Sequence, residues 1–248
     1  MNDQLNPVSV VIVVYNEAET IEEEIRRLHE IIVSRIPGSE FIVAEDGSTD
    51  GTKEIINRLI GELGIIHSTS GERIGYAKAL KNAVAMSRCS YVFFSDSGSK
   101  HNHKEFWDLY DLRKYYDMIS GERISRAKIR FRNIIRFCIT STFNRMVSYY
   151  FRINIIDSDC GYRIYNRKVV EKVFNEEWIN KDCVNYEIFL RSIFSGFSFK
   201  EVPVSYKVRK GKSRGMPYKK IPRVIFRILC NKSKLRRILF DKHYSFSK

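Results

Sequence analysis

The sequence predicts an α/β fold in which a mostly parallel sheet is flanked by helices. Two apolar runs, residues 8–14 and 41–44, have the length and composition of strands that are buried on both faces, as is typical of parallel sheets. Each run is followed by a polar loop and then by apolar residues at helical spacing. This order predicts a βαβ unit with parallel strands and a right-handed crossover.

The later elements follow the same alternation as far as residue 123. Thr20 and Glu23 fit a capping box at the start of the first helix, which Pro37 and Gly38 end. Further strands are expected at residues 65–67, 91–94, 118–120 and 199–206, and further helices at residues 55–63, 76–88, 105–114, 127–153, 168–174 and 185–194. Residues 157–163 are expected to form a polar loop.

The net charge of +14 is unevenly placed along the 248 residues. The excess lies in residues 123–152 and 207–242, and such basic regions attract phosphates of nucleic acids, anionic lipids or phosphorylated substrates. The five cysteines are scattered without a Cys-x-x-Cys pair, which favours reduced cytosolic thiols. We find no signal peptide and no apolar run of about 18 residues, the length of a membrane span.

Polar side chains follow three of the predicted strands: Tyr15, Asn16 and Glu17, then Glu45 and Asp46, then Asp96. Because ligands of open α/β sheets bind beyond the carboxyl ends of the strands, these residues form a candidate site. Carboxylates there can accept hydrogen bonds from the base or the ribose hydroxyls of a nucleoside, or hold a divalent cation against a pyrophosphate. Two alternatives stay open: Asp46 caps the next helix, or Tyr15 is a rim aromatic.

Several common α/β motifs are missing from the sequence. There is no Walker loop, no Gly-x-Gly-x-x-Gly after the first strand and no Gly-x-Ser-x-Gly, which argues against P-loop NTPases, dinucleotide oxidoreductases and α/β-hydrolases. His101 and His103 are expected at the surface, with a site-lining His101 as the alternative. No recognised nucleic-acid motif is present.

Three motifs, VSVVIVVYNEAETI, AEDGSTDGT and YVFFSDSGSK, resemble the nucleotide-sugar half of glycosyltransferase family 2, which has the Rossmann-like GT-A fold. The second half resembles dolichyl-phosphate mannose synthase and the bacterial polyprenyl-phosphate glycosyltransferases. The motifs that carry this second resemblance lie at residues 121–123, at Arg136 with Thr140 and Asn144, and at residues 157–163, 201–204 and 209–213.

The resemblance implies a role for each matching residue. The nucleotide sugar would be held by Tyr15, Asn16, Glu17, Glu45, Asp46, Lys78 and Asp96. The sugar diphosphate and the acceptor phosphate would be surrounded by Arg123, Arg136, Arg163 and Arg209, with Asn144 and Ser213 also on the acceptor side. An acceptor that is already a phosphate anion needs no strong base, so catalysis would rest on positioning and on cationic stabilisation of the leaving nucleotide. A single in-line displacement would invert the sugar carbon.

The sequence departs from the family pattern at the metal motif. Asp96 would be the first acid of an Asp-x-Asp motif for Mg²⁺ or Mn²⁺. Gly98, however, stands where the motif has its second acid, and Lys100 stands near the position at which the lipid-phosphate branch has a metal-binding Gln. We expect weakened metal binding, with Lys100 supplying part of the charge; alternatively Ser97, Ser99 or waters complete an ordinary site. Glu187 stands where relatives with hydroxyl acceptors carry a base, and is interpreted as a catalytic base or an acceptor-site ligand.

Residues 1–207 are expected to form the catalytic domain, and residues 208–248 a basic amphipathic segment. Such a segment can lie in a membrane interface; the alternative is a helix packed on the domain with a solvated basic face. The expected function is inverting transfer of a hexose from a GDP-mannose or UDP-glucose type donor to a polyprenyl or dolichyl phosphate. The chain would act as a peripheral protein at the cytoplasmic membrane face, with a membrane-protein partner or as a homo-oligomer.

Two other functions are consistent with the same residues. One is transfer to a sugar hydroxyl of a cell-surface glycan or lipid, with Glu187 as the base. The other is a catalytically degenerate module that only binds a nucleotide sugar, which Gly98 would permit. Binding of nucleic acid is not expected, because strand ends lined with carboxylates repel a phosphate backbone.

Overall fold

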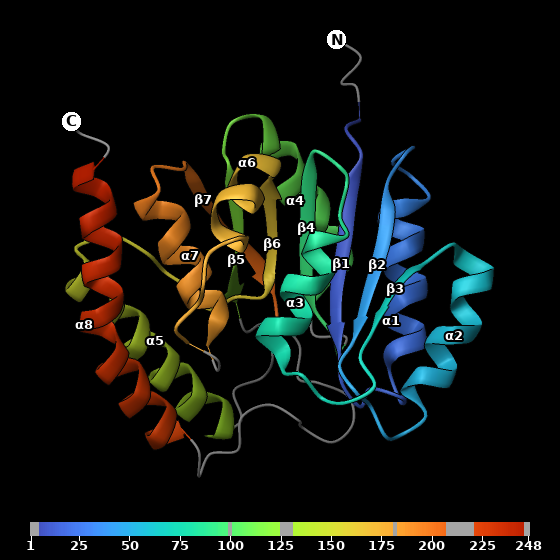
Figure 1. Cartoon of the computed structure of the whole chain (residues 1–248), viewed down its shortest axis with the longest axis horizontal. Helices are drawn as coiled ribbons and strands as arrows, with labels where there is room; N and C mark the ends of the chain where they lie inside the picture. Colours follow the sequence, from blue (N-terminus) through green and yellow to red (C-terminus); the bar gives the residue numbers. More distant parts are fainter. Residues whose placement is uncertain (1–4, 99–100, 125–130, 181–182, 207–220, 246–248) are drawn as a thin grey trace.

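A seven-stranded sheet lies at the centre of the computed structural model, which describes residues 5–98, 101–124, 131–180, 183–206 and 221–245 (Figure 1). The strand order is β3-β2-β1-β4-β6-β5-β7. The strands are β1 (Val8–Val14), β2 (Glu40–Glu45), β3 (Ile66–Thr69), β4 (Tyr91–Asp96), β5 (Met118–Ile124), β6 (Tyr162–Asn166) and β7 (Phe199–Ser205). Only β6 runs antiparallel to its neighbours β4 and β5 within this sheet. The predicted α/β class with a mostly parallel sheet is therefore confirmed.

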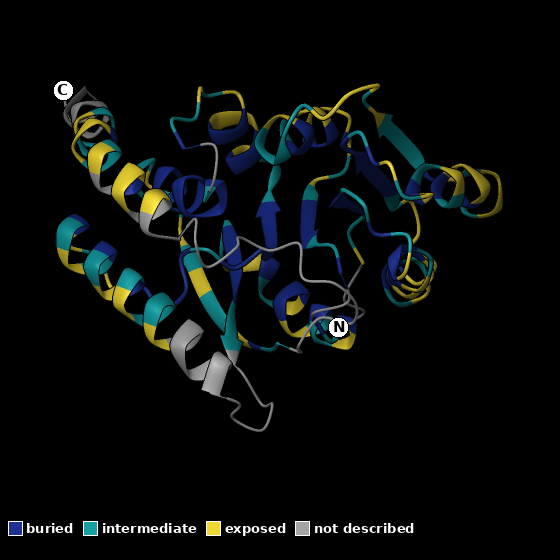
Figure 2. Ribbon diagram, turned by 90° about the horizontal axis from the view of Figure 1, so that it is seen from below, coloured by how far each residue is buried: buried dark blue, intermediate teal, exposed yellow. Residues whose placement is uncertain are grey.

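Helices cover both faces of the sheet, because successive strand residues point to opposite sides. The helices are α1 (Ile21–Leu28), α2 (Thr52–Leu63), α3 (Tyr76–Ala85), α4 (Phe106–Tyr110), α5 (Phe131–Phe151), α6 (Arg167–Val169), α7 (Val184–Phe194) and α8 (Ile221–Ser245), with short turns η1 (His29–Val33), η2 (His103–Glu105), η3 (Asp111–Lys114) and η4 (Val170–Phe174). Val10 and Ile12 pack with α1, α2 and α4, whereas Val11 and Val13 pack on the face that α3, α7 and α8 cover. Viewed from below, the central strands are buried, whereas the edge strands β3 and β7 and the outer faces of the helices are partly exposed (Figure 2).

Three local predictions were wrong. Strand β6 occupies part of the predicted polar loop, and Arg163 lies in this strand opposite Phe94 and Ser120. The capping box does not form: the Thr20 hydroxyl donates to Glu17 Oε2 over 3.2 Å. His103 is buried with its Nε2 3.0 Å from Glu24 Oε1, and the buried His101 stacks on an aromatic ring of β6. In the first and third cases, a polar side chain that was expected in a loop or at the surface is buried.

The register of the parallel strands brings their carboxyl ends together. Val14 pairs with Glu45, and Val13 pairs with Asp96 on the other side of β1. Just beyond β2, Gly47 has a φ of 72°, and a Cβ atom there would lie 2.5 Å from the backbone nitrogen of Arg73. Only glycine therefore allows the loop after β2 to pass so close to the loop before α3.

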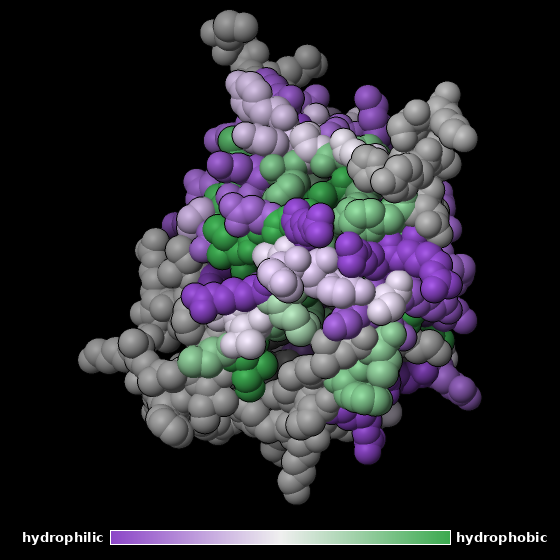
Figure 3. Space-filling view, turned by 90° about the vertical axis from the view of Figure 1, so that its left-hand side faces the viewer, coloured by the Kyte–Doolittle hydropathy of each residue, from purple (hydrophilic) through white to green (hydrophobic). Residues whose placement is uncertain are grey.

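The C-terminal helix α8 lies beside α7 and α5 (Figure 1). Ile228, Leu235 and Leu239 are buried in the same core cluster as α7, while Lys234 and Arg237 are exposed. Polar and apolar residues are interspersed on this side of the molecule (Figure 3). The burial of these three residues agrees with the interpretation of a packed helix for residues 221–245. The membrane-interface role stays a prediction. None of the described helices has the length and apolar content that a bilayer span requires.

We expect Leu235→Ala to lower the free energy of unfolding by about 2–4 kcal/mol, because it empties a fully buried site. The exposed neighbour Arg237 provides the control, and Arg237→Ala should change the free energy by less than about 0.5 kcal/mol. Urea denaturation of the full chain measures both. Equal stability of the two variants would mean that α8 does not pack on the domain in solution.

Candidate active site

Glu45 and Asp46, at the end of β2, are buried and used differently. Glu45 Oε1 accepts from the backbone N–H of Ser48, and its Oε2 lies 3.3 Å from Thr69 Oγ1, so this carboxylate fixes the loop after β2. Asp46 Oδ1 accepts from the backbone N–H groups of Ile74 and Gly75 over 2.8 and 2.9 Å. Asp46 thus holds the loop before α3, and its interpretation as a cap of α2 is wrong, because the N–H of Thr52 at the start of α2 donates to Asp50 Oδ1 instead.

Tyr15, Asn16 and Glu17, which follow β1, lie against the same loops. Asn16 has a φ of 55°, and its Oδ1 accepts from the backbone N–H of Thr49 over 2.7 Å. Glu17 is buried, at 5% exposure. The guanidinium of Arg73 lies 4.0 Å from the centre of the Tyr15 ring, a cation–π distance. An aromatic ring, carboxylates and an exposed arginine therefore meet at this edge of the sheet.

Asp96 ends β4 at the centre of this edge. Its backbone N–H donates to the Gly161 carbonyl over 2.7 Å, and its Oδ1 accepts from the Tyr76 hydroxyl over 3.0 Å. A Cβ atom on Gly161 would lie 2.3 Å from Asp96 Cγ. The carboxylate therefore rests directly on the Gly161 backbone, and no larger residue fits beneath it. Burial, followed by the Asp96 charge, raises the pKa of Tyr76 well above its ordinary value, so this phenol stays protonated as a donor.

Gly161 belongs to a turn at residues 157–161, here named the acidic turn, which side chains from three elements hold in place. Arg123 donates from Nε and Nη2 to the two oxygens of Asp157 over 2.6 and 2.7 Å, a bidentate pair. Asn144 Oδ1 accepts from the Ser158 hydroxyl over 2.7 Å. Glu201 Oε1 accepts from the Asp157 N–H over 2.7 Å. Arg123 and Asn144, both predicted phosphate ligands, thus fasten this turn.

Arg163 is completely buried and ties the acidic turn to two other elements. Its Nε donates to Ser120 Oγ in β5 over 2.9 Å, its Nη1 to the Asn185 carbonyl in α7 over 2.7 Å, and its Nη2 to the Ser158 carbonyl over 2.6 Å. All three guanidinium nitrogens are directed to protein acceptors. The geometry therefore gives Arg163 a positioning role and supports no direct contact with a phosphate.

Asp159 and Cys160 in the acidic turn have shifted titration. Burial raises the pKa of Asp159 to about 6; the charges of Asp157 and Asp96 add to the rise, while Arg123 and Arg163 oppose it. Burial also raises the pKa of the Cys160 thiol to about 12. Asp159 therefore lies within electrostatic range of Asp96, a proximity that sequence spacing did not predict.

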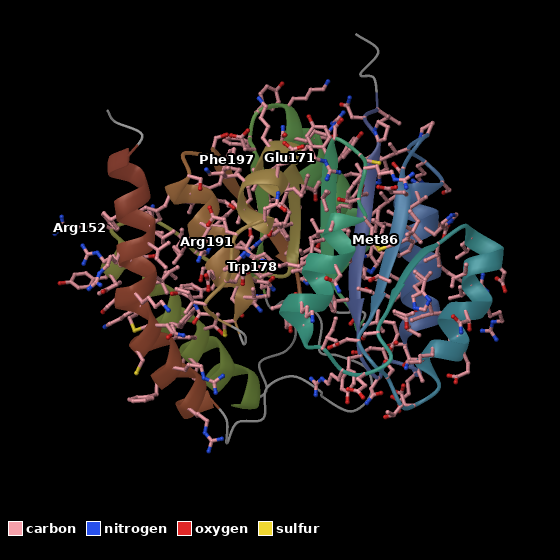
Figure 4. The ribbon with its side chains drawn as sticks, in the orientation of Figure 1. Met86, Arg152, Glu171, Trp178, Arg191 and Phe197 are labelled. Carbon is pink, nitrogen blue, oxygen red and sulfur yellow. The ribbon has the colours of Figure 1, made fainter. Side chains whose placement is uncertain are left out.

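Glu187 lies at 0% exposure in α7, away from solvent. Its oxygens accept from the backbone N–H groups of Ile179 and Asn180 over 2.9 and 2.7 Å and from Arg191 Nη2 over 2.7 Å. Arg191 also donates to the carbonyl before Trp178, and the two labelled residues lie near each other in Figure 4. This carboxylate is surrounded by donors, so the arrangement favours a structural role over that of a base.

The remaining predicted residues lie at the margins of the site or outside the described chain. Lys78 is exposed on α3. Arg136 lies in α5, but its side chain is not among those described. Lys100, Arg209 and Ser213, together with Ser99, lie outside the described residues. Sequence reasoning missed Tyr76, Asp157 and Asp159; the position of Tyr76 at the start of the helix after a glycine-containing loop was the one available signal.

Glu187→Gln should lower the free energy of unfolding by about 1–3 kcal/mol, because the buried Arg191 loses one of its two carboxylate partners and keeps only Glu176. The fully exposed Glu177 is the matched control, and Glu177→Gln should cost less than about 0.5 kcal/mol. Chemical denaturation measures both values. A Glu187→Gln protein with full stability and no turnover would instead identify Glu187 as a base.

Comparison with known proteins places this geometry in a family. The family model described as Glycosyl transferase family 2 matches residues 9–174. Glycosyltransferase AglD of Haloferax volcanii is 30% identical over 205 residues, which cover 81% of this chain and 33% of AglD; the chain thus spans about a third of that relative. The Dolichyl-phosphate hexose transferase of the same organism is 25% identical, covering 85% of this chain and 87% of that protein.

A solved structure has the same fold. Glucosyl-3-phosphoglycerate synthase of Mycobacterium tuberculosis, in complex with Mn²⁺, UDP and phosphoglyceric acid, superposes with a TM-score of 0.69 at 15% identity, covering 93% of this chain and 78% of that one. The sequence resemblance and the GT-A architecture are therefore confirmed. The family match covers most of the chain, including β1, β2 and β4 with their carboxylates, and the chain belongs to glycosyltransferase family 2.

Proposed function

We propose that this protein transfers a hexose from a nucleotide sugar to a polyprenyl or dolichyl phosphate, with inversion at the sugar carbon. The observation that carries the proposal is the similarity, over nearly the whole of both chains, to a protein named Dolichyl-phosphate hexose transferase. The convergence of Asp46 and Asp96 at the carboxyl edge of the sheet supports a nucleotide-sugar site there. A donor of the GDP-mannose or UDP-glucose type fits this site.

The donor would lie across the ends of β1, β2 and β4. Tyr15 and Arg73 offer a flat aromatic and cationic surface to the base, and Asp46 holds the loop before α3 against it. Asp96 lies where the diphosphate would follow, with Tyr76 fixing one carboxylate oxygen. Binding energy from the nucleotide would thus orient the sugar carbon for displacement, which is a large share of catalysis when two reactants must be aligned.

The residues fit a divalent cation of the kind that the family uses. Asp96 supplies a hard oxygen ligand, and the glycine beneath it makes room for the carboxylate in this position. Among the described residues, no group of three His, Cys, Asp or Glu could hold a metal, so phosphate oxygens and waters would complete the coordination, as is usual for Mg²⁺. The cation would neutralise charge on the leaving nucleotide diphosphate.

An acceptor phosphate needs positive charge and no base. Arg136 in α5 and Arg209 are our candidates for holding it, since an arginine fork binds phosphate through two hydrogen bonds. The enclosed position of Glu187 counts against the rival reaction, transfer to a sugar hydroxyl, which would need that residue as a base. It leaves the lipid-phosphate acceptor as the better-supported reading.

The acceptor lipid implies action at a membrane surface, and we place the protein peripherally at the cytoplasmic face. Arg223, Lys234 and Arg237 are exposed on α8, and each basic residue near an anionic surface contributes about 1 kcal/mol. This attraction requires only the basic face of α8, because its buried apolar residues pack on the domain. Salt-sensitive binding to anionic vesicles, with no binding to oligonucleotides, would support this location.

The test is transfer of labelled sugar from UDP-glucose and GDP-mannose to a short polyprenyl phosphate in the presence of Mg²⁺ or Mn²⁺. We expect a solvent-extractable lipid-linked sugar, and a loss of about 100-fold or more in Arg136→Ala if that arginine stabilises the departing charge. Arg145→Ala, an exposed arginine of the same helix, is the matched control. Donor hydrolysis without lipid product would favour a glycan acceptor; nucleotide binding with neither product would indicate a binding module.

Gly161→Ala should reduce transfer roughly 100-fold, because the added methyl group must displace the Asp96 carboxylate. The control is Gly61→Ala, an exposed helical position with nothing within 4 Å of the added carbon, where activity should be unchanged. Initial rates at saturating acceptor, together with melting temperatures, separate lost geometry from lost folding. Full activity of Gly161→Ala would show that the position of Asp96 does not matter for transfer.

A further inference from the structure

The acidic turn contains one carboxylate whose position the fold does not explain. Asp157 is paired with Arg123, and Ser158 with Asn144. Asp159 receives no hydrogen bond on its carboxylate from any residue in the described ranges, although its backbone N–H lies 3.4 Å from Asp157 Oδ1. The turn is therefore held by the residues around Asp159, while the Asp159 carboxylate takes no part in the hydrogen bonds that hold it.

Asp159 belongs to the turn on which the Asp96 carboxylate rests. The Tyr76 hydroxyl donates to Asp96 Oδ1 over 3.0 Å. Residue 161, two positions further along the turn, is in contact with the Asp96 carboxylate and accepts the Asp96 N–H. Two partly buried carboxylates so near each other repel unless a proton or a cation lies between them.

We propose that Asp159 supplies the second protein carboxylate of the divalent metal site, in place of the acid that the motif lacks at Gly98. The inference rests on the proposed function, because the metal would be the one that accompanies the nucleotide sugar. One carboxylate from β4 and one from the acidic turn give the two that Mg²⁺ sites commonly combine with substrate phosphates. The ligand thus comes from a position 61 residues beyond Gly98 in the chain.

The backbone explains why position 98 does not carry the acid itself. Gly98 has a φ of 102°, a conformation that residues with a side chain rarely adopt. An aspartate there would be strained, so the loop after β4 is built for glycine. The acidic turn, fastened by Arg123, Asn144 and Arg163, offers a rigid position for a replacement.

The experiment is equilibrium dialysis of the full chain against Mn²⁺ with UDP, and in parallel with GDP, with bound metal measured directly. Asp159→Asn is expected to weaken Mn²⁺ binding in the nucleotide complex by about 10-fold or more, as is Asp96→Asn. Asp159→Glu, which keeps the carboxylate, should recover part of the affinity. Asp108→Asn, an exposed acid on α4, is the matched control and should bind Mn²⁺ like the unmodified protein.

Thermal unfolding distinguishes a ligand from a structural residue. In metal-free buffer, Asp159→Asn should melt no lower than the unmodified protein, because it removes a repulsive charge; with Mn²⁺ and nucleotide its stabilisation should be smaller. A lower melting temperature without metal would contradict the proposal and indicate a structural role. Unchanged Mn²⁺ affinity in Asp159→Asn, or no Mn²⁺ bound by the unmodified protein with either nucleotide, would overturn it.

The transfer assay is read separately from metal binding. If Asp159→Asn binds Mn²⁺ normally while the unmodified protein still makes lipid-linked sugar, the inference fails and the proposed function stands. If the metal affinity falls as expected but the unmodified protein transfers no sugar, Asp159 is a metal ligand in a protein with another activity. The two failures therefore have different signatures.

Discussion

The hydrogen bonds of Arg163 are the constraint on which the second half of the structure depends. One buried guanidinium joins Ser120 in β5, Ser158 in the acidic turn and Asn185 in α7. A buried charge of this kind is tolerated only when its donors are satisfied, so the three acceptors must stay where they are. The position of the acidic turn against β4, and with it the support under Asp96, follows from this requirement.

The same constraint explains which parts of the fold could be predicted from sequence. β1, β2 and β4 are apolar runs that end in polar residues, and their pattern predicts both the strands and the edge where their carboxylates meet. β6 could not be predicted in this way, because Arg163, its second residue, makes the segment read as polar. Periodicity reports the average polarity of a face, and it cannot show that a charged residue has three buried partners.

The residues of the candidate site also fall into two groups: those that strand pairing places and those that were matched by a motif alone. Asp46 and Asp96 were predictable as site residues, since they follow strands whose register is set by parallel pairing. Arg123, Arg163 and Glu187 were predicted to act on substrate; the structure gives all three protein partners, which favours positioning roles. A motif match identifies a residue type at a position, whereas its hydrogen bonds decide whether it touches a ligand or positions a group that does.

The weakened metal site expected from Gly98 illustrates how far local spacing can be trusted. Within the motif, only Asp96 is an acid, and the second carboxylate is missing at Gly98. A cation, however, is bound by oxygens that are near in space, whatever their separation in sequence. The acidic turn is brought to Asp96 by antiparallel β6, the strand that sequence reasoning missed. Two neighbouring carboxylates repel each other, yet several buried hydrogen bonds hold the acidic turn against Asp96. Such an arrangement is expected where function, rather than stability, requires the charge.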